Sequence, residues 1–70
     1  MNTKELIKFI EDNGGLNISN LKRSYHYDFD LMSPRMKLRT DFKTYVAGVL
    51  QNSYGVSRYV AQKVTNYFIK

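Results

Sequence analysis

Three residues in the middle of this 70-residue chain have the side chains of a hydrolytic triad: Ser24, His26 and Asp28. A triad needs its histidine between two groups that converge from different elements, within hydrogen-bond reach of both. Here the three alternate along one segment whose pattern predicts a β-strand. On a strand, side chains two residues apart stand about 6.6 Å apart and point in parallel. We therefore expect a solvated strand face here and no enzymatic activity.

Metal and cofactor sites are not expected either. The chain has no cysteine and one histidine, so thiolate zinc sites are excluded. His26 with Asp28 and Asp30 could hold a divalent cation loosely, but a solvated strand face is the simpler interpretation. The glycines at 14, 15 and 55 stand where helices stop or the chain turns, so we expect no glycine loop that cradles phosphates. The sequence predicts a protein without metal or cofactor.

Charge is distributed unevenly along the chain. Eleven Lys and Arg against six Asp and Glu give a net charge of +5. Residues 1–30 carry −1, whereas residues 31–70 carry +6, with Asp41 as their one carboxylate. A positive face is therefore predicted, and its usual partners are nucleic acid, an anionic membrane or an acidic protein.

Length and hydropathy limit the kind of protein further. Seventy residues form a single small domain (1–70), whose core rarely supplies more than about 3–5 kcal/mol without a partner subunit. The longest nearly apolar run, residues 45–50, is too short to span a bilayer, and residues 1–10 lack the apolar stretch of a signal peptide. We expect a cytoplasmic protein that does not associate with membranes.

Residues 2–13 are predicted to form a helix. Asn2 and Glu5 have the spacing of a capping box, and the apolar side chains that follow recur at helical spacing. Asn13 and the two glycines after it end the helix. The connector at residues 16–22 fits either a short extended piece or one helical turn.

The centre of the chain predicts β-structure. Apolar residues alternate with polar ones from residue 24 to residue 31, which indicates a half-buried strand: Tyr25, Tyr27, Phe29 and Leu31. Two interpretations compete for residues 32–40. A second strand could return along the first as a hairpin, with opposite charges facing across the pair. Alternatively, Ser33 caps a short helix that begins at Pro34.

The last thirty residues read as two helices joined by a short turn. A helical stripe of apolar side chains runs from Phe42 to Leu50, and a second runs from Val56 to Phe68. The turn between them contains Gly55, and Ser57 can cap the final helix. The expected fold is thus α+β and mostly helical, with an N-terminal helix, a central hairpin or extended segment, and a C-terminal helix-turn-helix-like hairpin.

The segment Tyr54-Gly55-Val56-Ser57-Arg58 resembles the helix-turn-helix of bacterial and phage transcriptional regulators, over residues 50–67. An apolar residue, Gly, Val and Ser commonly lead from supporting to recognition helix in that superfamily. The resemblance implies that the last helix enters the major groove of double-stranded DNA, and that a homodimer reads paired half-sites. The implied groove-facing residues are Ser57, Arg58, Tyr59, Gln62, Lys63 and Asn66. Flanking phosphate contacts would come from Arg35, Lys37, Arg39 and Lys43.

A second hypothesis is a protein-binding module, such as a small inhibitor or adaptor of the phage or mobile-element type that binds a larger, acidic host protein. Gln51 stands where the regulators prefer alanine, and the chain has six tyrosines, a residue enriched at interfaces. This hypothesis requires an exposed apolar patch formed by Tyr59, Val60 and Tyr67. The DNA hypothesis instead requires the polar side chains of the last helix to be exposed together.

Overall fold

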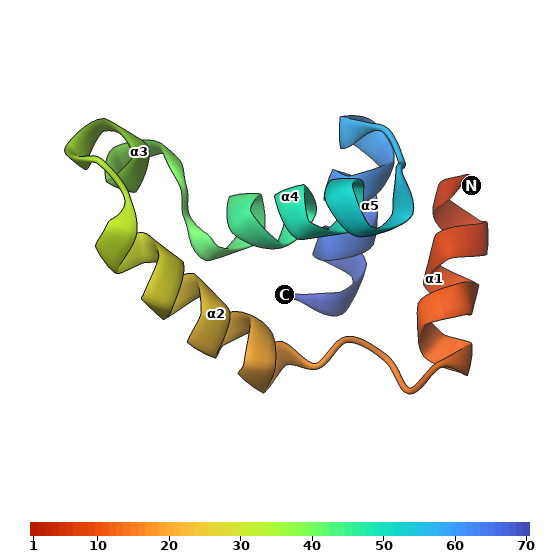
Figure 1. Ribbon diagram of the computed structural model, residues 1–70. Helices are drawn as coiled ribbons and strands as arrows, with labels where there is room; N and C mark the ends of the chain where they lie inside the picture. The colour runs from red at the N-terminus through yellow and green to blue at the C-terminus, as the bar shows by residue number, and fades with distance from the viewer.

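The computed structural model describes all 70 residues as five α-helices and contains no β-strand (Figure 1). In chain order the helices are α1 (Thr3–Asp12), α2 (Ile18–Leu31), α3 (Pro34–Arg39), α4 (Phe42–Tyr54) and α5 (Arg58–Phe68). The prediction of an α+β fold with a central hairpin is therefore wrong, while the helices predicted at both ends of the chain are confirmed. None of the five helices has the length and apolar character that crossing a bilayer would require.

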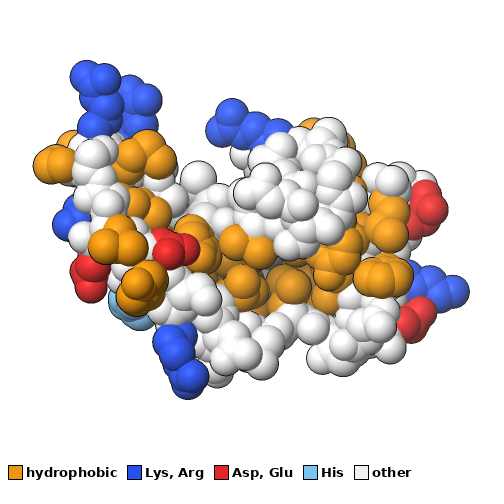
Figure 2. All heavy atoms as spheres, in the orientation of Figure 1, with side chains coloured by type: hydrophobic (Ala, Val, Ile, Leu, Met, Phe, Trp, Pro, Cys, Tyr) orange, Lys and Arg blue, Asp and Glu red, His pale blue; other side chains and the backbone are white.

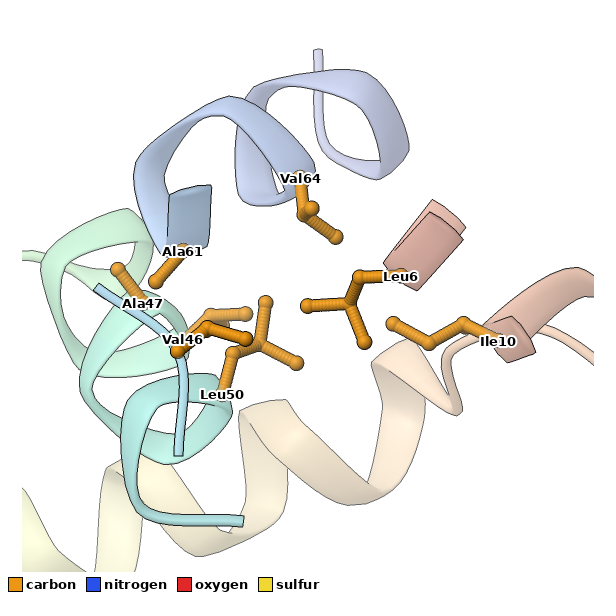
Figure 3. Packing of buried hydrophobic residues seen from close by; sticks show 8 residues of the cluster. Leu6, Ile10, Val46, Ala47, Leu50, Ala61 and Val64 are labelled. Atoms are coloured by element: carbon orange, nitrogen blue, oxygen red, sulfur yellow. The ribbon is translucent and has the colours of Figure 1, made fainter. Parts of the chain in front are cut away.

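The core lies between α1, α4 and α5. α5 packs against both of the other helices, and eight apolar side chains are buried where the three meet. Figure 3 shows Leu6 of α1 pointing into the space between Val64 of α5 and Leu50 of α4. The buried set consists of Leu6, Ile10, Val46, Ala47, Leu50, Val56, Ala61 and Val64.

Side-chain caps fix where the helices begin. In every helix the residue before the first turn accepts a hydrogen bond from the backbone N–H three residues later, which satisfies one unpaired donor of that turn. The capping residues are Asn2, Asn17, Ser33, Asp41 and Ser57. The predicted capping box is confirmed, since Asn2 and Glu5 each accept from the other's backbone N–H, at 2.9 and 3.3 Å.

The segment predicted as a strand is the second half of α2. Tyr25 and Phe29 are four residues apart and half-buried, with ring centroids 5.6 Å apart, whereas Tyr27 and Leu31 are 71% and 72% exposed. An alternating run of this length always contains residues four apart, so it also fits one face of a helix. The helix is favoured because it places Tyr25 against two aromatic rings of α4, with ring centroids 5.7 Å away at Phe42 and 5.3 Å away at Tyr45.

The second strand of the predicted hairpin is also absent, and the alternative interpretation is correct. Ser33 accepts from the Met36 N–H at 3.3 Å, and Pro34 occupies the first turn of α3, where its missing N–H costs nothing. Met36 and Leu38 are 49% and 90% exposed, so their alternation with basic residues does not reflect a buried strand face.

We call residues 18–39, which comprise α2 and α3, the α2–α3 arm. Neither helix of the arm has a fully buried residue, and α4 is its main packing partner. Two hydrogen bonds join the arm to the start of α4: Tyr25 Oη donates to the Thr40 carbonyl at 2.7 Å, and Tyr45 Oη donates to Asp28 Oδ2 at 2.5 Å. The hydrogen bond to Asp28 raises the pKa of the Tyr45 phenol, because it favours the neutral hydroxyl.

Candidate nucleic-acid interface

The turn between α4 and α5 has the local geometry expected from its residues. Gly55 adopts the left-handed conformation (φ 65°, ψ 28°), and its N–H donates to the Gln51 carbonyl at 2.9 Å. Val56 is buried between the helices, and Ser57 Oγ accepts from the Val60 N–H at 3.2 Å. Because this oxygen acts as an acceptor, the Ser57 hydroxyl hydrogen remains able to donate to a ligand. These three residues fix the angle at which α5 leaves α4.

α5 presents a polar face to solvent. Ala61, Val64 and the buried Thr65 define its inner side, and Thr65 Oγ1 donates to the Ala61 carbonyl at 2.8 Å. At 100° per residue, the side chains on the opposite side of the helix belong to positions 59, 62, 63 and 66. All of them are exposed, and so are Ser57 and Arg58 at the start of the helix. The six residues expected to face the DNA major groove are therefore exposed together: Ser57, Arg58, Tyr59, Gln62, Lys63 and Asn66.

A groove runs between α4 and α5 beside this face, and we call it the α4–α5 groove. It consists of two adjoining hollows of about 210 and 240 Å³, which share Thr44, Ala47 and Gln62. The other lining residues of α4 and of its cap are Asp41, Lys43, Gly48 and Gln51, and those of α5 are Arg58, Thr65 and Asn66. Since Arg58, Gln62 and Asn66 are spaced four apart, they form one edge of this polar groove.

Two lysines near α5 are held by neighbouring side chains. The Lys43 ammonium lies 3.5 Å from Asn66 Oδ1, a long hydrogen bond that links α4 to α5. The Lys63 ammonium lies 5.5 Å from the centroid of the Tyr59 ring, within the range of a cation–π interaction. Asp41 stands at the same end of the groove as Lys43. The backbone N–H of Thr44 holds the pKa of this carboxyl below its usual value, so its negative charge is present at neutral pH.

The three basic residues of α3 form a separate group. Arg35, Lys37 and Arg39 are exposed, and the Lys37 ammonium lies 5.4 Å from the centroid of the Phe29 ring. Figure 2 shows Lys and Arg side chains gathered over α3, next to exposed hydrophobic side chains. The main packing partners of α5 are α4 and α1, so the structure does not bring this group against α5. Of the predicted phosphate-binding residues, only Lys43 lines the α4–α5 groove.

The apolar patch required by the protein-binding hypothesis is divided. Tyr59 and Tyr67 are 66% and 49% exposed, but Val60 is half-buried against the core. Tyr67 Oη donates to Glu11 Oε2 of α1 at 3.2 Å, and this bond raises the pKa of the Tyr67 phenol. Greater apolar exposure is found elsewhere, at Leu31 and Leu38 of the α2–α3 arm.

Some residues of the interface were not predicted from the sequence. Thr44, Gly48 and Gln51 line the groove, whereas Lys43 was the one residue of α4 expected to contact DNA. Helical spacing predicts that these positions lie on the face of α4 opposite its apolar stripe, but it does not predict that this face forms a groove with α5. Gln51 lies half-buried at the edge of the contact between α4 and α5.

The side chains considered as a triad all belong to α2. Ser24 and Asp28 are four residues apart along the helix, and His26 lies between them on a different side, with its ring centroid 6.0 Å from that of Tyr25. Asp28 is already engaged as the acceptor for Tyr45.

The side chains of α5 and of the α4–α5 groove are mainly hydrogen-bond donors. Guanidinium, ammonium, amide and hydroxyl groups lie side by side, and such groups bind phosphate oxygens and the edges of bases. No protein-family model, curated protein or solved structure matches the chain. Any inference about what this surface binds therefore depends on its residues and their geometry.

Proposed function

We propose that this protein binds double-stranded DNA without catalysis, as a minimal transcriptional regulator or accessory factor of the cytoplasm, with α5 as its recognition helix. The observation that carries the proposal is the joint exposure of Arg58, Gln62, Lys63 and Asn66 on one side of α5. A helix of eleven residues with such a face has the size and chemistry that the major groove admits.

Each side chain of this face matches a group of DNA in its hydrogen-bonding chemistry. Arg58 and Lys63 would donate to O6 and N7 of guanine, the commonest specific contact of basic residues. Gln62 and Asn66 would bind adenine through paired hydrogen bonds to N6 and N7. Ser57 would donate its free hydroxyl hydrogen to a phosphate oxygen and so fix the position of the helix start.

Additional phosphate contacts would come from two places. Lys43 stands at the end of the α4–α5 groove, and Arg35, Lys37 and Arg39 stand apart on α3. The molecule is 35 Å long, close to one turn of duplex DNA at about 34–36 Å, so α3 would reach backbone beyond the base pairs under α5. One copy covers few base pairs, and we propose a homodimer on paired half-sites as the specific complex.

Fluorescence anisotropy with a labelled duplex of random sequence tests this proposal. Each Lys or Arg paired with a phosphate contributes about −0.9 to the slope of log affinity against log salt. Between about 50 and 200 mM salt, three such pairs lower the affinity about 40-fold, and six lower it about 10³-fold. We expect micromolar binding at about 50 mM salt, and an affinity that falls between about 40-fold and 10³-fold when the salt is raised to about 200 mM. Absence of binding at about 50 mM salt would overturn the proposal.

A second candidate function is binding to an acidic protein surface, as an inhibitor or adaptor of the phage type. The observation in its favour is the α2–α3 arm, where Leu31 and Leu38 are 72% and 90% exposed close to the basic residues of α3. Replacing both leucines with serine separates the two functions. If the arm serves a protein partner, the wild type recovers a protein from cell extract that the double variant does not, while both bind duplex DNA equally well; equal recovery by the two would exclude the arm as the binding surface.

A further inference from the structure

Gly48 lies in α4 at a position where neither the backbone conformation nor packing within the chain requires a glycine. It lies mid-helix, where glycine costs about 1 kcal/mol relative to alanine. The glycines with positive φ are Gly14, Gly15 and Gly55, so the backbone at Gly48 does not require glycine. Outside the adjoining residues and the local backbone of α4, a Cβ atom at this position would meet nothing within 4 Å, so packing against other parts of the chain does not require glycine either.

Gly48 opens onto the α4–α5 groove. Around it, side chains from both helices project hydrogen-bond donors: the Thr44 hydroxyl, the amides of Gln51 and Gln62, and the Arg58 guanidinium. The hollow they line has a volume of about 240 Å³. Because glycine has no side chain, a ligand in the groove can approach the helix backbone closely at this position, which is a recognised use of glycine.

We propose that a phosphate strand of bound DNA lies in the α4–α5 groove and contacts the α4 backbone at Gly48. This inference rests on the proposed DNA binding and adds a location for the strand. Lys43 places a positive charge at one end of the groove, and the Thr44 hydroxyl and the Gln51 amide of α4, which have no role in the proposed base contacts, can donate to the oxygens of a phosphodiester, which are acceptors only. Asp41 introduces one carboxylate at the Lys43 end, so the strand approaches from the Arg58 side. A side chain at position 48 would hold the strand away from the helix.

The test compares Gly48→Ala and Gly48→Leu with the wild type, in thermal unfolding and in duplex binding by anisotropy. Alanine and leucine both favour helix, the Cβ atom that each adds meets open space, and the longer leucine side chain enters the hollow of about 240 Å³, so both variants are expected to unfold at higher temperature than the wild type. Duplex affinity is expected to fall nevertheless, about threefold for alanine and about tenfold or more for leucine, in order of side-chain size. Ser53→Ala serves as the control, because Ser53 is exposed on α4 outside the groove lining, and its affinity is expected to stay unchanged.

The outcomes separate this inference from the proposed function. If the wild type binds DNA and Gly48→Leu binds equally well, the strand does not lie at Gly48, although DNA binding stands. If the wild type does not bind DNA, both proposals are wrong. If Gly48→Ala unfolds at lower temperature than the wild type, the position is not open and the inference fails on its structural premise.

Discussion

Tyr25 attaches the α2–α3 arm to the rest of the molecule. Its ring centroid lies 5.6 Å from that of Phe29, 5.7 Å from Phe42 and 5.3 Å from Tyr45. Its hydroxyl donates to the Thr40 carbonyl at 2.7 Å, directly before α4. Two substitutions separate these contributions, because Tyr25→Phe removes only the hydrogen bond and Tyr25→Ala removes the ring as well.

The expected losses follow from the half-buried position of Tyr25. Removing one partly solvated hydrogen bond lowers the free energy of unfolding by about 0.5–1 kcal/mol. A fully buried aromatic ring costs about 3–5 kcal/mol when truncated to alanine, and about half of that applies here, so with the hydrogen bond Tyr25→Ala costs about 2–3.5 kcal/mol in all. The total free energy of unfolding expected for 70 residues is about 3.5–10 kcal/mol, so at the lower end of this range the alanine variant is close to unfolding.

Urea unfolding followed by far-ultraviolet circular dichroism measures both effects. With a slope of about 1 kcal/mol per molar urea, the midpoint falls by about 0.5–1 M for Tyr25→Phe and by about 2–3.5 M for Tyr25→Ala. Tyr27→Ala is the matched control, since it removes the same side chain from the same helix where it is 71% exposed, and it should cost less than about 0.5 kcal/mol. Equal losses at Tyr25 and Tyr27 would refute the docking of α2 on α4 through this ring.

Two further predictions concern the ends of α4. Gly55→Ala should lower the free energy of unfolding by about 1 kcal/mol, because φ is 65° at this residue, and unchanged stability in urea unfolding would contradict the left-handed turn. Asp41→Ala should cost about 1 kcal/mol at neutral pH through loss of the helix cap. Since the folded-state pKa of Asp41 lies below its ordinary value of 3.8, this contribution is present above that pH and is lost as the pH falls through the folded pKa. Unfolding midpoints of wild type and variant should therefore converge below about pH 4, and a gap that persists in acid would count against the charged cap.

Short sequence patterns were sufficient to predict where several helices begin and end. The capping box at Asn2 and Glu5, the glycine turn at Gly55 and the cap at Ser57 depend on neighbouring residues only, and all were predicted correctly. The strand predicted for residues 24–31 was wrong because its alternation fits two registers. The choice between them depends on Phe42 and Tyr45, which are distant in sequence and become partners only when α2 docks on α4.

The candidate interface was predictable in part for the same reason. Exposure of Gln62, Lys63 and Asn66 follows from helical periodicity within α5, and these positions are exposed as expected. The groove depends on how α4 and α5 pack together, which the sequence of either helix alone does not define. The open position of Gly48 could therefore not be recognised before both helices were placed.

Duplex binding by a double variant on α5 tests the central claim, that α5 is the DNA-contacting helix, most directly. Arg58→Ala/Lys63→Ala removes two exposed cations from α5, and Lys4→Ala/Lys8→Ala removes the same charge from exposed positions of α1. Circular dichroism first confirms that both double variants are folded. We expect the α5 variant to lose duplex affinity by about 30-fold or more, at about 1 kcal/mol or more per contact, while the α1 variant changes by less than about threefold. Equal losses in the two variants would show that binding reflects net charge alone and would contradict the assignment of α5.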